Sequence, residues 1–166
     1  MNKFKTSLLA TALLVVAPMA MAAGSASTSL NVTLTLENTC GITASPVNFG
    51  TQTSLAADID ATGSVTVTCT STGGVYNVAF NGGAAAGGGT IAQRKLLNGA
   101  SNTIDYNLYT TAGRTVLLGD GTTGVVVSGT GNGAAQAFTV YGRVAGGQNP
   151  KPVGVYTDVV TATVSF

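Results

Sequence analysis

The chain has 166 residues, of which 8% are charged, and its formal net charge at pH 7 is +1. Soluble domains carry about 25% charged residues, so this composition favours a protein covered by neighbours in an assembly, although a glycine-rich secreted domain has a similar composition. The chain has no basic patch for a nucleic-acid backbone, and we expect no nucleic-acid partner. It has no histidine to act as a general base, so we expect neither an enzyme nor a bound cofactor.

Residues 1–22 have the pattern of a signal peptide. Lys3 and Lys5 precede an apolar run, and Ala20-Met21-Ala22 supplies the small residues that signal peptidase requires. The run is shorter than the roughly 20 residues that a transmembrane helix needs. Cleavage would leave residues 23–166 with five basic and six acidic residues, a net charge of −1.

The chain contains two cysteines, Cys40 and Cys69. An exported chain passes through an oxidising compartment, where such a pair normally closes into a disulfide. A zinc site would need more ligands than two cysteines. We therefore expect a disulfide between Cys40 and Cys69 and no metal.

Beyond the signal peptide, apolar and polar residues alternate with a period of two, which predicts strands rather than helices. The alternating apolar residues fall in six stretches: Leu30, Val32, Leu34 and Leu36; Val65 and Val67; Tyr76, Val78 and Phe80; Ile104, Tyr106 and Leu108; Phe138, Val140 and Val144; and Val160, Ala162, Val164 and Phe166.

Turn and loop signals separate these stretches. Asn-Gly or Asp-Gly dipeptides that start at positions 81, 98, 120 and 132 predict tight turns. The Gly/Ala-rich residues 82–89 and the proline-bearing residues 148–152 predict loops. Short strands at this spacing predict one all-β sandwich.

Two short motifs resemble ligand sites, but their surroundings favour simpler interpretations. Residues 119–124 match the G-x-G-x-x-G dinucleotide pattern, which works only between a strand and a helix. Apolar stretches flank these residues on both sides, so we expect a loop between two strands. Asp58 and Asp60 have a spacing seen in calcium sites, but two carboxylates alone are weak, and we expect a solvated loop.

The two ends of the mature chain are the most informative. Residues 25–37 have one apolar face, and the final strand, residues 160–166, ends the chain. A sandwich that ends there would lack a closing strand, and the N-terminal strand of a neighbour could cover the open edge by β-augmentation. The same alternation fits a first strand that pairs within its own domain.

Five segments occur in an order that is typical of one protein family. They are residues 38–40 (Asn-Thr-Cys), 47–50 (Val-Asn-Phe-Gly), 65–69 (Val-Thr-Val-Thr-Cys), 106–115 (Tyr-Asn-Leu-Tyr, then Gly-Arg-Thr) and 152–166, which begin Pro-Val-Gly-Val-Tyr-Thr-Asp. On these segments the chain resembles the spore coat protein U domain family over nearly its whole mature length. Subunits of the archaic, Csu-type chaperone–usher pili share this domain.

The resemblance implies an incomplete immunoglobulin-like β-sandwich at residues 39–166 that lacks its last strand, with a donor strand at residues 23–38. It implies that Cys40 and Cys69 form the family's disulfide. It further implies donor residues that fill pockets of a neighbour, which are Leu30, Val32, Leu34 and Leu36. The wall of the acceptor groove, which also docks the chaperone, would be Val160, Ala162, Val164 and Phe166.

The implied partners are further copies of the chain, other pilus subunits, a periplasmic chaperone and an outer-membrane usher. We therefore expect a structural subunit of an adhesive pilus at the cell surface, supporting attachment and biofilm formation. A shaft position is favoured, because a tip adhesin would carry a second domain. Two alternatives stay open, a non-fibrous spore or cell coat protein and a secreted sugar-binding module. The second is weaker because the chain has no tryptophan.

Overall fold

The computed structural model describes residues 23–85, 89–99 and 101–166. The predicted signal peptide, residues 1–22, lies outside the described residues. The described part contains eight strands and no helix, as the alternation predicts. The strands are β1 (Cys40–Ser45), β2 (Ile59–Cys69), β3 (Thr72–Phe80), β4 (Arg94–Asn98), β5 (Asn102–Tyr109), β6 (Val127–Asn132), β7 (Ala135–Val144) and β8 (Ala162–Ser165).

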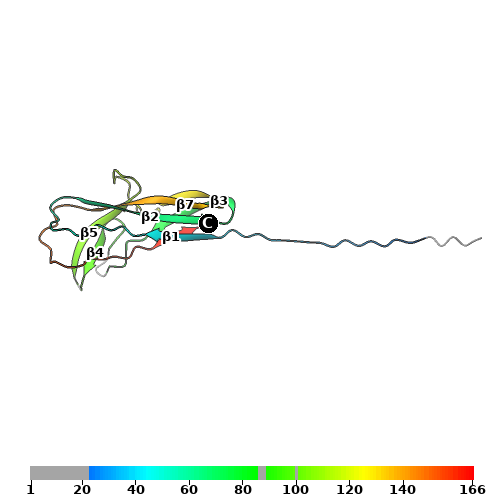
Figure 1. Cartoon of the computed structure of the whole chain (residues 1–166), viewed down its shortest axis with the longest axis horizontal. Coiled ribbons are helices and arrows are strands. Elements are labelled where there is room, and N and C mark those ends of the chain that lie inside the picture. Colours follow the sequence, from blue (N-terminus) through cyan, green and yellow to red (C-terminus); the bar gives the residue numbers. More distant parts are fainter. Residues whose placement is uncertain (1–22, 86–88, 100) are drawn as a thin grey trace, which may run out of the picture. The chain divides into compact units, whose positions relative to one another are not determined.

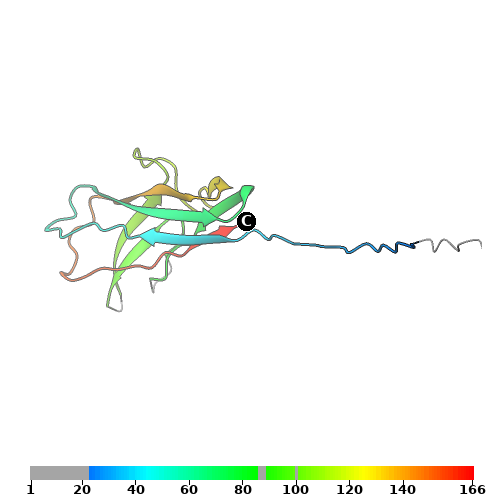
Figure 2. The ribbon, with the colours of Figure 1, turned by 45° about the vertical axis from the view of Figure 1, so that its right-hand side comes forward.

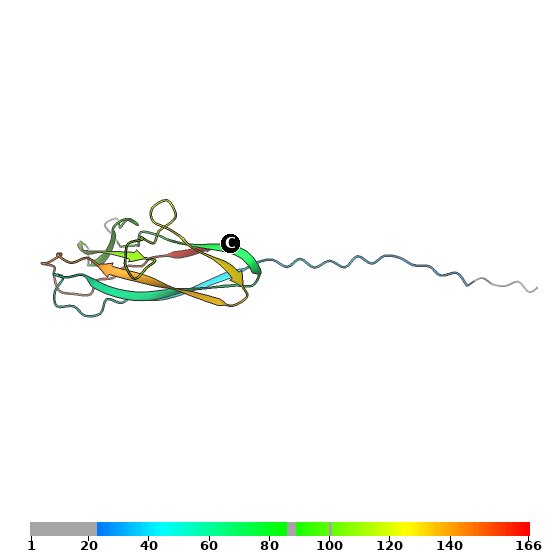
Figure 3. The ribbon, with the colours of Figure 1, turned by 90° about the horizontal axis from the view of Figure 1, so that it is seen from above.

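The strands form two antiparallel sheets that pack against each other. One sheet has five strands in the order β1-β2-β7-β5-β4, and the other has three in the order β6-β3-β8. Figure 1 labels most of these strands, and Figure 3 shows from above that β2 (teal) and β8 (red) lie in different layers. The predicted all-β sandwich is confirmed.

The core fills the space between the sheets. Successive side chains of a strand point to opposite faces, so the apolar residues of each alternating stretch share the inner face. The buried apolar side chains of the strands are Val65, Val67, Cys69, Tyr76, Val78, Phe80, Ile104, Tyr106, Leu108, Val140 and Val144. Leu118, from the long connection between β5 and β6, completes the core.

The segment between β1 and β2 enters the core beside two strand glycines. Val47 and Phe49 pack against the core, and the Phe49 ring meets Tyr106 edge-on at 6.1 Å between centroids. A Cβ atom on Gly142 would lie 2.6 Å from Val47 Cγ1 and 2.9 Å from Phe49 Cζ. A Cβ atom on Gly63 would lie 2.9 Å from Val47 Cγ2. Glycine is disfavoured inside strands, and here it gives room to the Val47 and Phe49 side chains.

Two of the four predicted turns join consecutive strands, although β4 was not among the expected strands. Residues 98–99 connect β4 to β5 and residues 132–133 connect β6 to β7, with φ of 65° at Gly99 and 77° at Gly133. Residues 148–152 form no helix or strand, as predicted. The described residues of the Gly/Ala-rich segment also form a loop, although residues 86–88 lie outside the described part.

Residues 119–124 form a tight loop, and no helix follows them. Asp120 Oδ1 accepts hydrogen bonds from the backbone amides of Thr122 at 2.9 Å and Thr123 at 2.7 Å. A Cβ atom on Gly119 would clash with the Thr123 carbonyl oxygen, so this glycine serves the loop rather than a pyrophosphate. The preceding stretch makes isolated bridges only, including one between Leu117 and Tyr109, so the strand expected there is wrong.

The described N-terminal segment, residues 23–35, contains no helix or strand, and its side chains are exposed. The compact body is Leu36–Phe166. The first strand of the chain is β1, which starts at Cys40. The alternating leucines and valine near the N-terminus therefore do not form a paired first strand of their own domain in the described structure.

Candidate functional site

Two strand edges lie side by side in the compact body. β1 ends the five-stranded sheet and pairs with β2 alone, and β8 ends the three-stranded sheet and pairs with β3 alone, within the described residues. Figure 2 shows β1 (cyan) next to β8 (red), with the two strands pointing in opposite directions. An unpaired edge presents a row of backbone donors and acceptors that a further strand can use.

A cleft of about 380 Å³ opens into the core between these edges. Residues 44–47, at the end of β1 and just after it, form one wall, and residues 158–160 with Ala162 form the other. The floor consists of core side chains, which include Val65, Phe80, Leu96, Tyr106, Leu108 and Val140. Ligand pockets typically measure about 300–1,000 Å³. An apolar cleft between two unpaired edges has the features that an extended apolar segment requires.

The four predicted groove residues have different environments in the structure. Val160 and Ala162 line the cleft. Val164 packs against the core beside the cleft without lining it. Phe166 is 58% exposed. The alternation of the final stretch is thus kept through Val164, and Phe166 departs from it.

The four predicted donor residues share one property, which is nearly complete exposure. Leu30, Val32, Leu34 and Leu36 are 85%, 85%, 91% and 88% exposed. Single exposed apolar residues are common on proteins, but a contiguous series is typical of a binding surface. The backbone of this segment belongs to neither sheet, so its amides and carbonyls are also free of any ladder.

The predicted disulfide is present, between Cys40 and Cys69. The two residues are directly opposed in the register of β1 and β2. The bond therefore joins the first residue of the edge strand to the last residue of its neighbour. This attaches the edge strand β1 covalently to the sheet at one end, while its other end borders the cleft.

Asp158 is a residue of the cleft that the alternation did not predict. Its Oδ2 atom accepts a hydrogen bond from the Tyr106 hydroxyl at 2.7 Å, and its Oδ1 atom accepts from the amides of Ala84 at 2.9 Å and Ala85 at 3.0 Å. Burial and this carboxylate raise the pKa of Tyr106 above its ordinary value, so the hydroxyl stays a donor. The sequence signal was that Asp158 is the one charged residue after Lys151.

Arg94 is a second polar residue that the sequence did not reveal. It is fully buried, at 0% exposure. Its Nε and Nη2 atoms donate to the Asn81 carbonyl at 3.0 and 2.8 Å, and Nη2 also donates to the Leu118 carbonyl at 3.0 Å. Burial lowers the pKa of Arg94, but a guanidinium stays protonated in proteins. Arg94 thus ties the loop after β3 to the long β5–β6 connection.

Asp58 and Asp60 are exposed, as expected, but Asp60 lies in β2 rather than in a loop, and both carboxylates form ion pairs. Arg143 donates from Nε to Asp60 Oδ1 at 2.7 Å and from Nη2 to Oδ2 at 2.9 Å, and its Nη1 atom lies 3.1 Å from Asp58 Oδ2. Arg114 lies 3.1 Å from the same Asp60 oxygen. The hydrogen bonds from Arg143 lower the pKa of Asp60. Both carboxylates are therefore already bound by arginine.

Other ligand chemistry finds little support in the described residues. They hold no cluster of three or more side chains that could bind a metal ion. Within the same residues, no helix is long and apolar enough to cross a membrane. A second depression, of about 500 Å³, lies over β5, the end of β7 and the residues just before β4. Its Asp105 side chain already binds Lys95 and Gln93, so that carboxylate is not free for a ligand.

Comparison with known proteins places the chain in a family. The family model of the Spore Coat Protein U domain matches residues 26–163. The chain belongs to this family. The match covers all eight strands of this Spore Coat Protein U domain except the last residues of β8. No curated protein matches the sequence.

Solved structures resemble this Spore Coat Protein U domain in fold. One is a chain of the CsuC–CsuE chaperone–tip adhesion subunit pre-assembly complex from archaic chaperone-usher Csu pili of Acinetobacter baumannii, with a TM-score of 0.57 and 20% identity over 80% of this chain. The present chain spans 41% of that chain's length. The E. coli Hda pilus minor tip subunit HdaB is matched at a TM-score of 0.45 and 20% identity, over 74% of this chain and 80% of that one. The predicted immunoglobulin-like class of sandwich is confirmed.

Proposed function

We propose that the chain is a structural subunit of an adhesive chaperone–usher pilus and that it polymerises by donor-strand exchange. One observation carries the proposal. The chain combines a free segment with four exposed, alternating apolar side chains and a body with an apolar cleft between two unpaired strand edges. Segment and cleft are complementary in chemistry, so one subunit can complete the sandwich of the next by β-augmentation.

The energetics support such a joint. Burying an exposed leucine or valine side chain contributes about 1.5–3 kcal/mol, so four such side chains contribute roughly 6–12 kcal/mol before the cost of ordering the segment. The backbone groups of the donor would add ladder hydrogen bonds along β1 or β8. These contributions are large enough to hold subunits together, whereas the isolated segment gains nothing from its apolar residues.

In this proposal residues 1–22 direct export, and residues 23–38 form the donor strand. A periplasmic chaperone covers the cleft until an outer-membrane usher exchanges it for a donor strand, and the product is a fibre on the cell surface that supports attachment and biofilm formation. The likeness in fold to a chain solved in a chaperone–subunit complex supports a chaperone partner. We give the chain no catalytic role, and the proposal covers a main or an adaptor subunit of the fibre.

A matched pair of variants tests the donor assignment. Leu34→Asp places a charge on the apolar face of the donor segment, and Thr33→Asp places the same charge on the opposite face. We expect Leu34→Asp to abolish polymerisation while the disulfide-bonded body still folds, and Thr33→Asp to polymerise. Normal fibres from Leu34→Asp would remove the donor-strand assignment.

The family description leaves one alternative, a non-fibrous coat protein. Such a protein would bind a spore or cell surface without an ordered polymer. Leu34→Asp would then leave surface association unchanged, because association would not require insertion of the segment. The same pair of variants therefore separates the two functions.

A further inference from the structure

The segment that leads into β8 crosses from one sheet to the other beside the cleft. Thr157 forms two backbone hydrogen bonds with Leu97 of β4. The Leu97 amide donates to the Thr157 carbonyl at 2.8 Å, and the Thr157 amide donates to the Leu97 carbonyl at 3.0 Å. Four residues later, Thr161 forms two hydrogen bonds with Asn81. The Asn81 amide donates to the Thr161 carbonyl at 3.1 Å, and the Thr161 amide donates to Asn81 Oδ1 at 2.9 Å. Residues 158–160 lie between these two anchors and belong to no strand, yet they form a wall of the cleft.

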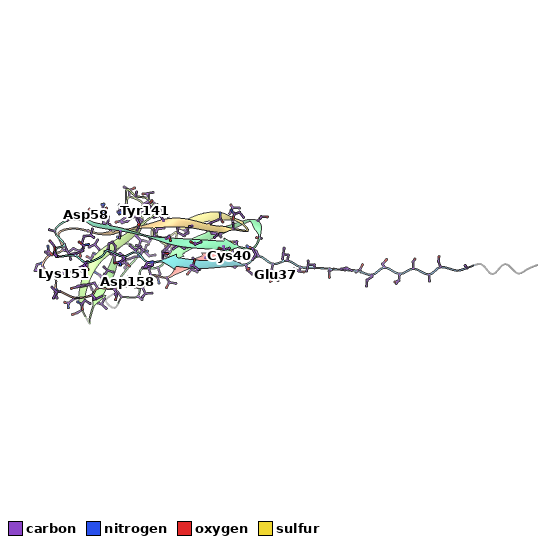
Figure 4. The ribbon with its side chains drawn as sticks, viewed as in Figure 1. Glu37, Cys40, Asp58, Tyr141, Lys151 and Asp158 are labelled. Atoms are coloured by element: carbon purple, nitrogen blue, oxygen red, sulfur yellow. A yellow bond between two sulfur atoms is a disulfide. The ribbon has the colours of Figure 1, made fainter. Side chains whose placement is uncertain are left out.

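Inside this crossing segment, the Asp158 side chain makes polar contacts that fix the segment to the core. The Asp158 carboxylate binds the Tyr106 hydroxyl and the amides of Ala84 and Ala85. Tyr106 is buried on β5, which is an interior strand of the five-stranded sheet. In Figure 4, Asp158 lies toward the end of the body away from Cys40. The wall is therefore fixed to the core at the end of the cleft that the disulfide does not reach.

We propose that Asp158 and Tyr106 are positioning residues for strand acceptance, which hold this wall of the cleft in place before a donor strand arrives. The inference rests on the proposed function and names residues that it did not include. Residues 158–160 form no ladder hydrogen bonds. Without the contacts of Asp158, they would therefore become ordered only when the donor strand binds. Fixing them beforehand removes that entropic penalty from the binding step, which raises affinity without any new contact to the donor.

The positioning role of Tyr106 can be tested apart from its contribution to the stability of the core. The Tyr106 ring packs in the core and meets Phe49, whereas its hydroxyl reaches only the wall. Tyr106→Phe removes the hydroxyl and keeps the ring. Tyr156→Phe is a matched control, because Tyr156 precedes the crossing segment and its hydroxyl binds the Pro152 carbonyl at 2.8 Å, outside the cleft.

The experiment uses the disulfide-bonded mature chain, residues 23–166, and a fluorescent peptide with the sequence of residues 25–38. The rate of peptide capture and its dissociation constant are measured for each variant. The chain's own N-terminal segment competes equally in all variants. Loss of a hydrogen bond to a charged group predicts at least about tenfold weaker binding for Tyr106→Phe and no change for Tyr156→Phe.

A conservative variant distinguishes position from charge. In Asp158→Asn, the amide oxygen can still accept from the backbone and the amide nitrogen can donate to the Tyr106 oxygen, so we expect capture close to that of the unchanged chain. Asp158→Ala should lose capture as Tyr106→Phe does. Circular dichroism of each free variant shows whether its fold is retained.

Each outcome is decisive. Capture by the unchanged chain with equal capture by Tyr106→Phe would overturn the positioning role and leave the proposed function intact. A loss in Asp158→Asn as large as in Asp158→Ala, with the fold retained, would also overturn it. Failure of the unchanged chain to capture the peptide would contradict the proposed function itself, and the positioning role with it.

Discussion

Cys40 and Cys69 stand directly opposite each other in the register of β1 and β2, and their disulfide joins the start of the edge strand to the end of its neighbour. The bond closes a loop with a sequence separation of 29 residues. On the chain-entropy model, such a loop contributes about 3–4 kcal/mol by restricting the unfolded chain. We expect replacement of both cysteines by serine to lower the free energy of unfolding by about that amount.

Urea unfolding of the mature chain with and without both cysteines measures this difference. Because β1 is also a wall of the cleft, capture of the donor peptide should fall together with stability. Equal unfolding midpoints for the two proteins would show that the β1–β2 ladder holds the edge strand without the disulfide.

Gly142 is predicted to be intolerant of any side chain. Its added Cβ would lie 2.6 Å from Val47, which lines the cleft, and 2.9 Å from Phe49, which packs against the core. Overpacking of a core costs about 1–3 kcal/mol, so Gly142→Ala should lower the free energy of unfolding by that amount. Gly41→Ala is the control, because its added Cβ has only the Thr68 carbonyl oxygen nearby, at 4.0 Å. Similar unfolding midpoints for the two variants would contradict the packing described for Val47.

Arg94 is predicted to stabilise the body through carbonyl groups rather than through an ion pair. Arg94→Met would leave the carbonyls of Asn81 and of the buried Leu118 without their donor. We expect a cost of about 1–3 kcal/mol for the unsatisfied carbonyl of Leu118 and a smaller one for that of the exposed Asn81. Lys95→Met, at the next position, removes a partly exposed ion pair with Asp105 and should cost at most about 1 kcal/mol. Thermal unfolding compares the two, and a larger loss in Lys95→Met would refute the role given to Arg94.

Asp60 is predicted to make stability depend on pH at the acidic end. Arg143 lowers the pKa of Asp60 below its ordinary value of 3.8, so the folded state binds this proton less readily than the unfolded state. The contribution of Asp60 is therefore fully present above the unfolded pKa and is lost as pH falls through the lower folded pKa. Because the site is solvent-exposed, the effect is small and weakens with salt.

Urea midpoints of the unchanged chain and of Asp60→Asn, taken from pH 6 to pH 2, test this dependence. The unchanged chain should be the more stable one at pH 6, and the difference should shrink as the pH falls. A difference that stays constant over this range would mean that Asp60 acts through packing and not through its charge.

Much of the body follows from the sequence because its signals are local. Period-two alternation identified the inner faces of β2, β3, β5 and β7. The dipeptides at residues 98–99 and 132–133 marked the turns that lead into β5 and β7. The disulfide followed from the number of cysteines and the export signal. Each of these patterns depends on neighbouring residues or on composition, which a single sequence contains.

The remaining features depend on contacts between distant residues. Tyr106 and Asp158 are 52 positions apart, and no local pattern relates a strand tyrosine to an aspartate of a later segment. The apolar run around Leu117 has no alternation that would show how it pairs. The sequence therefore did not reveal that this run makes isolated bridges and no strand. Alternation alone also left open whether Leu30 and its neighbours pair within their own domain, because period two describes any half-buried strand whichever partner covers it.

In the proposed function, the chain forms a polymer whose subunits are held together by exchanged strands. The most direct measurement is an SDS gel of material sheared from producing cells, with one sample boiled and one not. A strand-exchanged polymer should give a ladder of subunit multiples without boiling, which collapses to the monomer band after boiling. A monomer band in both samples would contradict the polymer, because the subunits would then not be joined by exchanged strands.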